Sequence, residues 1–356
     1  MNVALIGYGF MGRAHSNAYH QVGRFFDLKR LPVAKLICGR NREALDQMAS
    51  QWGWEETAVD WRAAIDRKDI DIVDIATPNG LHAEIALAAA QAGKIVLCEK
   101  PLAISLDEAR KMAAAVAGRP NGVWFNYRRI PAVSFAKELI EEGRVGTPYH
   151  YRATYVNQSG ADPKRRTGWK LERRLAGAGV IGDLLSHVAD LALWLNAPIR
   201  QLCAMSHTFV EGREIEDAAA VLVRFSNGSM GTLEATKFGV GVQNRNTFEI
   251  HGSNGMLAYN MEDMNRLVYV DARVPKRMQG PAYLPVTGPD QPYAANFWRP
   301  GHPIGYEHTF IATLGDFLGA LGQGTPFHAD FEDGLRVQEV LDAVERSAAS
   351  GAWVTL

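Results

Sequence analysis

The chain has 356 residues, enough for two domains that each bury a sizeable core. Its 38 lysines and arginines nearly balance 39 aspartates and glutamates, for a net charge of -1. This balance excludes the strong basic field that recruits nucleic acid or an anionic membrane, and we expect no stretch apolar enough to span a bilayer.

The first part of the chain alternates strand-like and helix-like segments. Apolar runs predict strands at 3–6, 33–38, 70–76, 95–98 and 123–126. Between them, helices are predicted at 12–21, 42–52, 81–92 and 106–116. Strands that alternate with helices form βαβ units, so we predict a doubly wound parallel sheet in a domain that spans residues 1–126.

A glycine motif joins the first predicted strand to the first predicted helix. It reads Gly7-Tyr8-Gly9-Phe10-Met11-Gly12. In a dinucleotide-binding loop the first glycine allows a tight turn, the second lets the backbone approach the pyrophosphate, and the third lets helix and strand pack closely. A lone motif of this kind is weak, but its position between strand and helix predicts a Rossmann nucleotide site.

A lysine follows the strand predicted at 95–98, in the sequence Glu99-Lys100-Pro101. Ligands of open α/β sheets bind in the crevice beyond the carboxyl ends of the strands. Lys100 is therefore placed for chemistry on a bound ligand.

After residue 127 the pattern changes. Helices are predicted at 132–142 and 182–195, and strands at 148–157, 221–225, 230–235, 247–251 and 256–259. Runs of strands after a βαβ region predict an α+β domain with a largely antiparallel sheet, over residues 127–356. Residues 271–302 predict a long loop, followed by helices at 306–322 and 331–350 and a strand at 353–356.

The helix predicted at 182–195 carries a second group of polar residues. Asp183 and His187 are four residues apart and share a helix face, and Asp190 lies three residues beyond His187. A carboxylate near an imidazole fixes its tautomer and stabilises the imidazolium, as a general base requires. The alternative is a structural histidine that is satisfied by a neighbouring acid.

Together these motifs resemble the Gfo/Idh/MocA oxidoreductase family over nearly the whole chain. The matching motifs are Gly7 to Gly12, Ala76-Thr77-Pro78-Asn79 with His82, Glu99-Lys100-Pro101, Phe125-Asn126-Tyr127-Arg128, and Asp183-x3-His187-x2-Asp190. Within the family, residues 10–16, 125–129 and 247–252 resemble levoglucosan dehydrogenase-like members. The resemblance implies hydride transfer between a secondary alcohol of a sugar, anhydrosugar or cyclitol and a nicotinamide. It also implies an open C-terminal sheet that forms a homodimer or homotetramer.

The resemblance and the chemistry assign consistent catalytic roles. His187 is the expected base, and Asp183 orients it or binds a neighbouring hydroxyl. Lys100 hydrogen-bonds the reacting oxygen and stabilises its negative charge, or accepts the proton itself. The resemblance also places further residues at the cofactor (Thr77, Pro78, Asn79, His82, Glu99 and Trp169) and at the substrate (Tyr127 and Asn157). Trp169 could instead be a core residue, and Tyr127 and Asn157 could serve packing or the sheet surface.

The end of the second predicted strand bears on the choice of cofactor. It lacks the acidic residue that binds the ribose hydroxyls in NAD enzymes, and reads Cys38-Gly39-Arg40-Asn41-Arg42. Arg40, with Arg42, could pair a 2′-phosphate. We therefore expect NADP to be favoured and NAD to be possible, since Arg40 stacked on adenine would allow either.

Other function classes remain open at this stage. They are a glycosidase of the same fold that oxidises its substrate transiently with NAD, and a non-catalytic nucleotide-binding regulator. We expect no metal site, because the ten histidines form no HExxH motif. Three separated cysteines and a start without a leader pattern predict a cytoplasmic protein. His15 is expected to be a surface or core residue, and the run Lys164-Arg165-Arg166 to be solvated.

Overall fold

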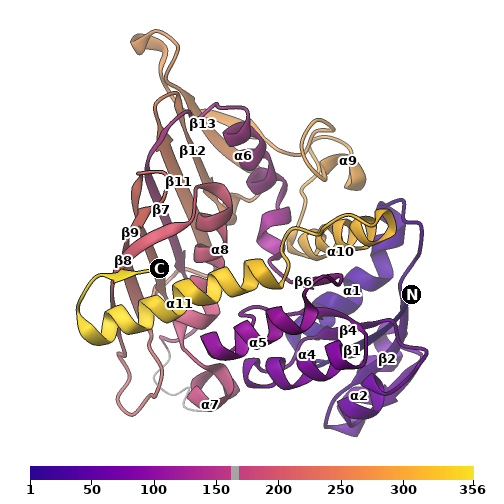
Figure 1. Ribbon diagram of the computed structural model, residues 1–356. Coiled ribbons are helices and arrows are strands. Elements are labelled where there is room, and N and C mark those ends of the chain that lie inside the picture. Colours follow the sequence, from indigo (N-terminus) through magenta and orange to yellow (C-terminus); the bar gives the residue numbers. More distant parts are fainter. Residues whose placement is uncertain (162–167) are drawn as a thin grey trace. The chain divides into compact units, whose positions relative to one another are not determined.

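The computed structural model describes residues 1–161 and 168–356, which form two compact units (Figure 1). Unit 1 comprises Met1–Asn126 and Tyr306–Gln338, and unit 2 comprises Tyr127–Gly305 and Glu339–Leu356. The first boundary follows residue 126, where the sequence pattern changes. The run Lys164-Arg165-Arg166 lies outside the described residues.

Unit 1 contains a six-stranded parallel sheet in the order β3-β2-β1-β4-β5-β6. This is the doubly wound order of a dinucleotide-binding fold, so the predicted Rossmann sheet is confirmed. The strands are β1 (Asn2–Ile6), β2 (Val33–Cys38), β3 (Glu56–Ala58), β4 (Ile72–Ile75), β5 (Ile95–Cys98) and β6 (Asn121–Val123). The helices are α1 (Phe10–Phe25), α2 (Arg42–Trp52), α3 (Trp61–Ile65), η1 (Asn79–Leu81), α4 (His82–Gln91) and α5 (Leu106–Val116), and η2 (Asn126–Arg129) lies at the boundary with unit 2.

Two helices from the end of the chain contribute to unit 1, which differs from the prediction that residues 127–356 form one domain. They are α10 (Tyr306–Gln323) and the first part of α11 (Phe331–Ser350). α10 lies beside α1 (Figure 1), where a side chain on Gly315 would overlap the Phe26 ring. Such long-range helix packing leaves no local signal in the sequence.

Unit 2 contains a sheet that has nine strands among the described residues, in the order β14-β13-β12-β11-β7-β10-β9-β8-β15. Among the strands that the structure describes in this sheet, only β7 and β10 pair in parallel, so the predicted largely antiparallel, open sheet is confirmed. The strands are β7 (Pro148–Val156), β8 (Ile199–His207), β9 (Ala218–Phe225), β10 (Met230–Thr236), β11 (Arg245–Gly252), β12 (Gly255–Asn260), β13 (Arg266–Asp271), β14 (Ala282–Pro285) and β15 (Val354–Thr355).

Helices cover one face of this sheet, with α6 (Pro131–Glu141) and α8 (Ser186–Leu195) packed on it (Figure 1). Side chains of β9 and β10 alternate between buried and exposed, so the other face is open to solvent. The predicted long loop contains β14 and two short helices, which the sequence did not predict because these elements are too brief to show a period. The remaining short helices are η3 (Trp169–Leu171), α7 (Arg173–Ala176), the π-helical turn η4 (Ile181–Leu185), η5 (Met261–Asp263), η6 (Lys276–Met278) and α9 (Ala294–Phe297).

One helical run in unit 2 corrects the expectation about bilayer-spanning stretches. Arg173–Leu195 is long and apolar enough to cross a membrane by length and composition, with a mean hydropathy of 1.4. However, 78% of the 18-residue window that gives this value is buried inside the fold, as in the core helix of a water-soluble domain. The glycines at 177, 179 and 182 interrupt the apolar pattern, which is why the sequence did not predict one run.

Candidate active site

The glycine loop between β1 and α1 has the geometry that a dinucleotide requires. Gly7 has φ +115°, and a Cβ there would overlap Ala76 O; a Cβ at Gly12 would overlap Gly7 O. At Gly9 nothing lies within 4 Å of the Cβ position, so the backbone is open to a ligand. No side chain caps the first amides of α1, and its first turn carries no acid. The loop therefore fits a pyrophosphate.

The residues after β4 form a second part of this half-site. Thr77 Oγ1 is buried and finds no hydrogen-bond partner among the described residues, which is costly unless a ligand supplies one. Pro78 precedes Asn79, the buried first residue of η1. The orphaned hydroxyl therefore fits a bound cofactor as the glycine loop does.

His82 has a different position from the one predicted. Its ring is fully buried, with Nδ1 3.0 Å from Pro101 O and Nε2 3.1 Å from Thr77 O. Burial lowers its pKa, and the hydrogen bonds to the Thr77 and Pro101 carbonyls oppose this shift in part. Because both nitrogens face backbone carbonyls, His82 is placed to hold the loops after β4 and β5 together rather than to contact a dinucleotide.

Glu99-Lys100-Pro101 follows β5, as the sequence predicted. Glu99 is buried, and its Oε2 accepts a hydrogen bond of 3.0 Å from the Lys100 backbone amide. Lys100 itself is half-buried. The carboxylate thus holds the backbone from which the Lys100 side chain extends.

The segment after β2 is more exposed to solvent than the segments after β4 and β5. A side chain on Gly39 would overlap the Tyr8 ring, so Tyr8 covers this position. Arg42 pairs with Asp46, at 3.0 Å between Nε and Oδ2. Arg40 is exposed and makes no ion pair with the described residues, so it is the more available of the two cations.

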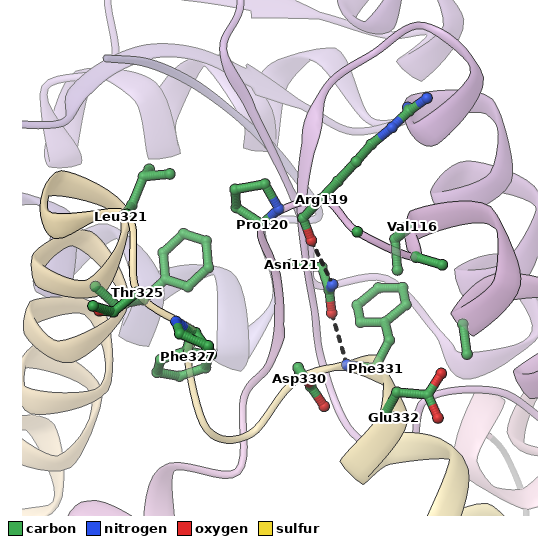
Figure 2. Close-up of a pocket in the computed structure, with 17 residues that line it drawn as sticks. Val116, Arg119, Pro120, Asn121, Leu321, Thr325, Phe327, Asp330, Phe331 and Glu332 are labelled. Carbon is green, nitrogen blue, oxygen red and sulfur yellow. Dashed lines mark hydrogen bonds between the residues drawn. The ribbon is translucent and has the colours of Figure 1, made fainter.

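A cavity of about 420 Å³ in unit 1 lies elsewhere, at the amino end of β6 and the carboxyl ends of α5 and α10 (Figure 2). Asn121 crosses its wall, donating to Arg119 O and accepting from Phe331 N. The Arg119 guanidinium donates to Ala90 O. These polar groups serve the fold, and the cavity is at the opposite end of the strands from the glycine loop.

In unit 2, the helix that carries Asp183 and His187 begins close to the segment before β9. A Cβ on Gly179 would overlap Glu216 O, so only glycine permits this approach. Glu216 Oε1 accepts a hydrogen bond of 2.9 Å from Ile181 N. The chain then makes the π-helical turn η4 before α8. Such turns are frequent at functional sites, and Asp183 lies within this one.

The Asp183 carboxylate lies between two ammonium groups. Its Oδ1 is 3.0 Å from Lys170 Nζ and its Oδ2 is 3.1 Å from Lys237 Nζ. All three residues line a cavity of about 180 Å³, together with Ser159, Gly160, Leu171, Arg213, Ile215, Glu216 and Asp217. The sequence predicted no role for either lysine. A signal was present for Lys237, because it directly follows strand β10, much as Lys100 comes shortly after β5.

His187 is buried on α8 against two tyrosines. Its ring stacks on Tyr127 with a centroid separation of 4.3 Å, and Tyr155 lies 5.8 Å away. The Tyr127 and Tyr155 hydroxyls are hydrogen-bonded at 2.9 Å. Tyr127, predicted at the substrate, is thus placed to fix the imidazole plane.

Asp190 binds the guanidinium of Arg128, with 2.6 Å between Oδ1 and Nη2. Its Oδ1 and Oδ2 also each accept a bond of 3.1 Å from Arg128 Nε. The pair is buried and joins α8 to the segment before α6. Asp190 therefore holds the helix in place.

Comparison with known proteins then identifies the chain. Residues 1–127 match the model of the oxidoreductase family with an NAD-binding Rossmann fold, and residues 133–258 match the GFO/IDH/MocA C-terminal domain. The protein is 39% identical to levoglucosan dehydrogenase of Pseudarthrobacter phenanthrenivorans, over 99% of this chain and 97% of the relative. It belongs to the Gfo/Idh/MocA oxidoreductase family. The predicted resemblance and the oxidoreductase class are confirmed.

Two further relatives of this Gfo/Idh/MocA protein are informative. A solved structure of levoglucosan dehydrogenase in complex with NADH and levoglucosan has a TM-score of 0.96, with 40% identity over 100% of this chain and 99% of that chain. The 1,5-anhydro-D-fructose reductase of Ensifer adhaerens is 40% identical over 53% of this chain and 56% of the relative.

Two predicted site residues occupy less central positions in this Gfo/Idh/MocA protein. Asn157 Oδ1 accepts hydrogen bonds from Ser159 N and Oγ, at 3.0 and 2.7 Å, and so shapes the turn after β7. Trp169 is half-buried, with Lys170 Nζ 5.6 Å from its ring centroid. It is not a core tryptophan, and its predicted contact with a cofactor stays a prediction.

Proposed function

We propose that this protein transfers a hydride between a secondary alcohol of a sugar, anhydrosugar or cyclitol and a nicotinamide dinucleotide. The observation that carries the proposal is a cofactor half-site with an open Gly9 backbone and an orphaned Thr77 hydroxyl, in a full-length relative of a sugar dehydrogenase. The charged cavity around Asp183 supports a polyhydroxylated substrate, because carboxylates and ammonium groups bind hydroxyls well.

Each proposed catalytic residue has a separate task. Lys100 hydrogen-bonds the reacting oxygen and stabilises negative charge as the proton leaves. His187 removes the hydroxyl proton, and its ring plane is held by Tyr127. Asp183, between its two lysines, binds a neighbouring hydroxyl. The bound nicotinamide supplies the hydride acceptor or donor.

For the cofactor, the chain is NAD-binding by family, and we propose that it also accepts NADP and favours it. The absence of an acid at the end of β2 and the exposed Arg40 support this proposal. The NADH bound in the solved relative supports NAD use instead. The ratio of kcat/KM for the two cofactors decides the preference.

The open face of the unit 2 sheet supports a homodimer or homotetramer. It exposes apolar side chains on separate strands, among them Met205, Leu222 and Met230. Cys38, Cys98 and Cys203 are free thiols, which supports a cytoplasmic location.

The decisive experiment incubates the purified protein with NAD or NADP and a panel of sugars, anhydrosugars and cyclitols. We expect net formation of reduced cofactor, seen by its near-ultraviolet absorbance, with at least one of them. Glycoside cleavage without net reduction would instead identify the transiently oxidising glycosidase. Cofactor binding without any turnover would favour the non-catalytic regulator.

A further inference from the structure

Unit 1 holds a buried polar cluster that the reaction proposed above does not use. It consists of His15, Tyr19, Asp74, Glu99 and Trp124, and we call it the His15 cluster. All five residues are buried. They come from α1, β4 and the segments after β5 and β6, and Glu99 directly precedes Lys100 in the chain.

The two ring nitrogens of His15 each face a carboxylate. Nδ1 lies 3.0 Å from Asp74 Oδ2, and Nε2 lies 3.1 Å from Glu99 Oε1. A neutral imidazole has one N–H and would turn a lone pair towards one of these oxygens, whereas an imidazolium donates to both. Burial alone lowers the pKa of His15, but Asp74 and then Glu99 outweigh it and raise the pKa to about 9.

The surroundings of His15 fix one side of the cluster more firmly than the other. Asp74 also accepts hydrogen bonds of 2.9 Å from Tyr19 Oη and from Trp124 Nε1. The Trp124 ring stacks on the imidazole at 4.1 Å, and Phe310 of α10 lies 5.7 Å away. The Asp74 carboxylate is therefore held in place by hydrogen bonds from three residues.

Glu99 has fewer donors. Its Oε1 accepts from His15 Nε2, and its Oε2 accepts from the Lys100 backbone amide. The contacts thus run in series from Asp74 through His15 and Glu99 to the backbone of Lys100. At the other end of the Glu99-Lys100-Pro101 segment, the His82 ring contacts Pro101 O.

We propose that His15 is a positioning residue for the hydride-transfer reaction: its imidazolium links Asp74 to Glu99 and thereby fixes the backbone of Lys100. The inference rests on the proposed role of Lys100 at the reacting oxygen. It assigns to His15 a function, whereas the sequence predicted only a surface or core residue.

A matched pair of variants tests this link. In His15→Gln the amide nitrogen can replace Nε2 and keep the bond to Glu99, whereas in His15→Asn it can replace only Nδ1 and keep the bond to Asp74. We expect His15→Asn to lower kcat/KM for the sugar about 100-fold, since small misplacements of a reacting group have effects of this size. His15→Gln should stay within about fivefold of the wild type, because the bond to Glu99 remains.

Tyr19→Phe is the control for simple loss of stability. It removes one buried hydrogen bond to Asp74 and leaves the link from His15 to Glu99 intact. We expect a lower melting temperature with nearly unchanged kcat/KM. Equal loss of kcat/KM in His15→Asn and His15→Gln, in proportion to their loss of melting temperature, would overturn the proposal.

A spectroscopic measurement keeps this inference separate from the proposed function. In the wild-type protein, the ¹⁵N shifts of His15 should show both ring nitrogens protonated at neutral pH. A neutral ring would overturn the positioning link whatever the activity. A protein with protonated His15 but no turnover on any sugar would instead overturn the proposed function.

Discussion

The charged groups of the His15 cluster in unit 1 and those around Asp183 in unit 2 differ in how they are paired. In unit 1, Asp74, His15 and Glu99 are buried and joined by short hydrogen bonds. In unit 2, Asp183 is reached by Lys170, which is 47% exposed, and by Lys237, which is 11% exposed. A desolvated network holds one geometry, whereas partly solvated ion pairs exchange partners at little cost. The His15 cluster therefore holds one geometry, whereas Asp183 can exchange its contact with the exposed Lys170 for a ligand hydroxyl.

The largest effect is expected at the two residues proposed to act in catalysis, Lys100 of unit 1 and His187 of unit 2. Lys100→Met and His187→Ala should each lower kcat about 100-fold or more, the size of losing charge stabilisation or a general base. Steady-state kinetics with the best sugar from the panel measures this. Unchanged kcat in both variants would remove these residues from the mechanism.

A smaller effect on kcat/KM should distinguish the two lysines that contact Asp183. Lys237→Met should lower kcat/KM for the sugar about tenfold, because its nearly buried ammonium is hard for water to replace. Lys170→Met is the matched control and should change kcat/KM about twofold, as expected of an exposed pair. Equal losses in the two variants would contradict the view that burial decides their importance.

Arg40 tests the end of β2 in unit 1. Arg40→Ala should raise KM for NADP about tenfold and change KM for NAD little, since only NADP carries the 2′-phosphate. Arg42→Ala is the control, because Arg42 already pairs with Asp46. A similar change for both cofactors would show that Arg40 stacks on adenine.

The smallest effect concerns stability, and it contrasts two buried histidines of unit 1. The pKa of His15 is raised to about 9, so its contribution is complete below pH 6.5 and is lost as the pH rises towards 9. The pKa of His82 is lowered, so its contribution is present above pH 6.5 and declines as the pH falls below it. For His15 the change should be about 3 kcal/mol, since each pKa unit corresponds to about 1.4 kcal/mol.

The measurement is the free energy of unfolding against pH for the wild type, His15→Gln and His82→Gln. The difference between the wild type and His15→Gln should shrink at alkaline pH, and that for His82→Gln should shrink at acidic pH. Two differences with the same pH slope would show that the carboxylates and carbonyls do not set these charges.

Much of the fold followed from local pattern. The glycine loop, the strands β2 and β5 and the helices α2 and α5 occupy the predicted residues, because their apolar periods are long and clear. The strands β8 and β13 were missed, and α10 was placed in the wrong unit. These elements depend on partners that are distant in the sequence.

The sequence by itself determined the family, the order of the units and the motifs that carry Lys100, Asp183 and His187, since each is a local spacing of particular residue types. Tertiary structure alone decided which charges meet. Lys170 and Lys237 are 67 residues apart and share Asp183, and His15 lies 59 residues from Asp74 and 84 from Glu99. Burial lowers the pKa of both histidines, but at His15 two carboxylates outweigh it and raise the pKa.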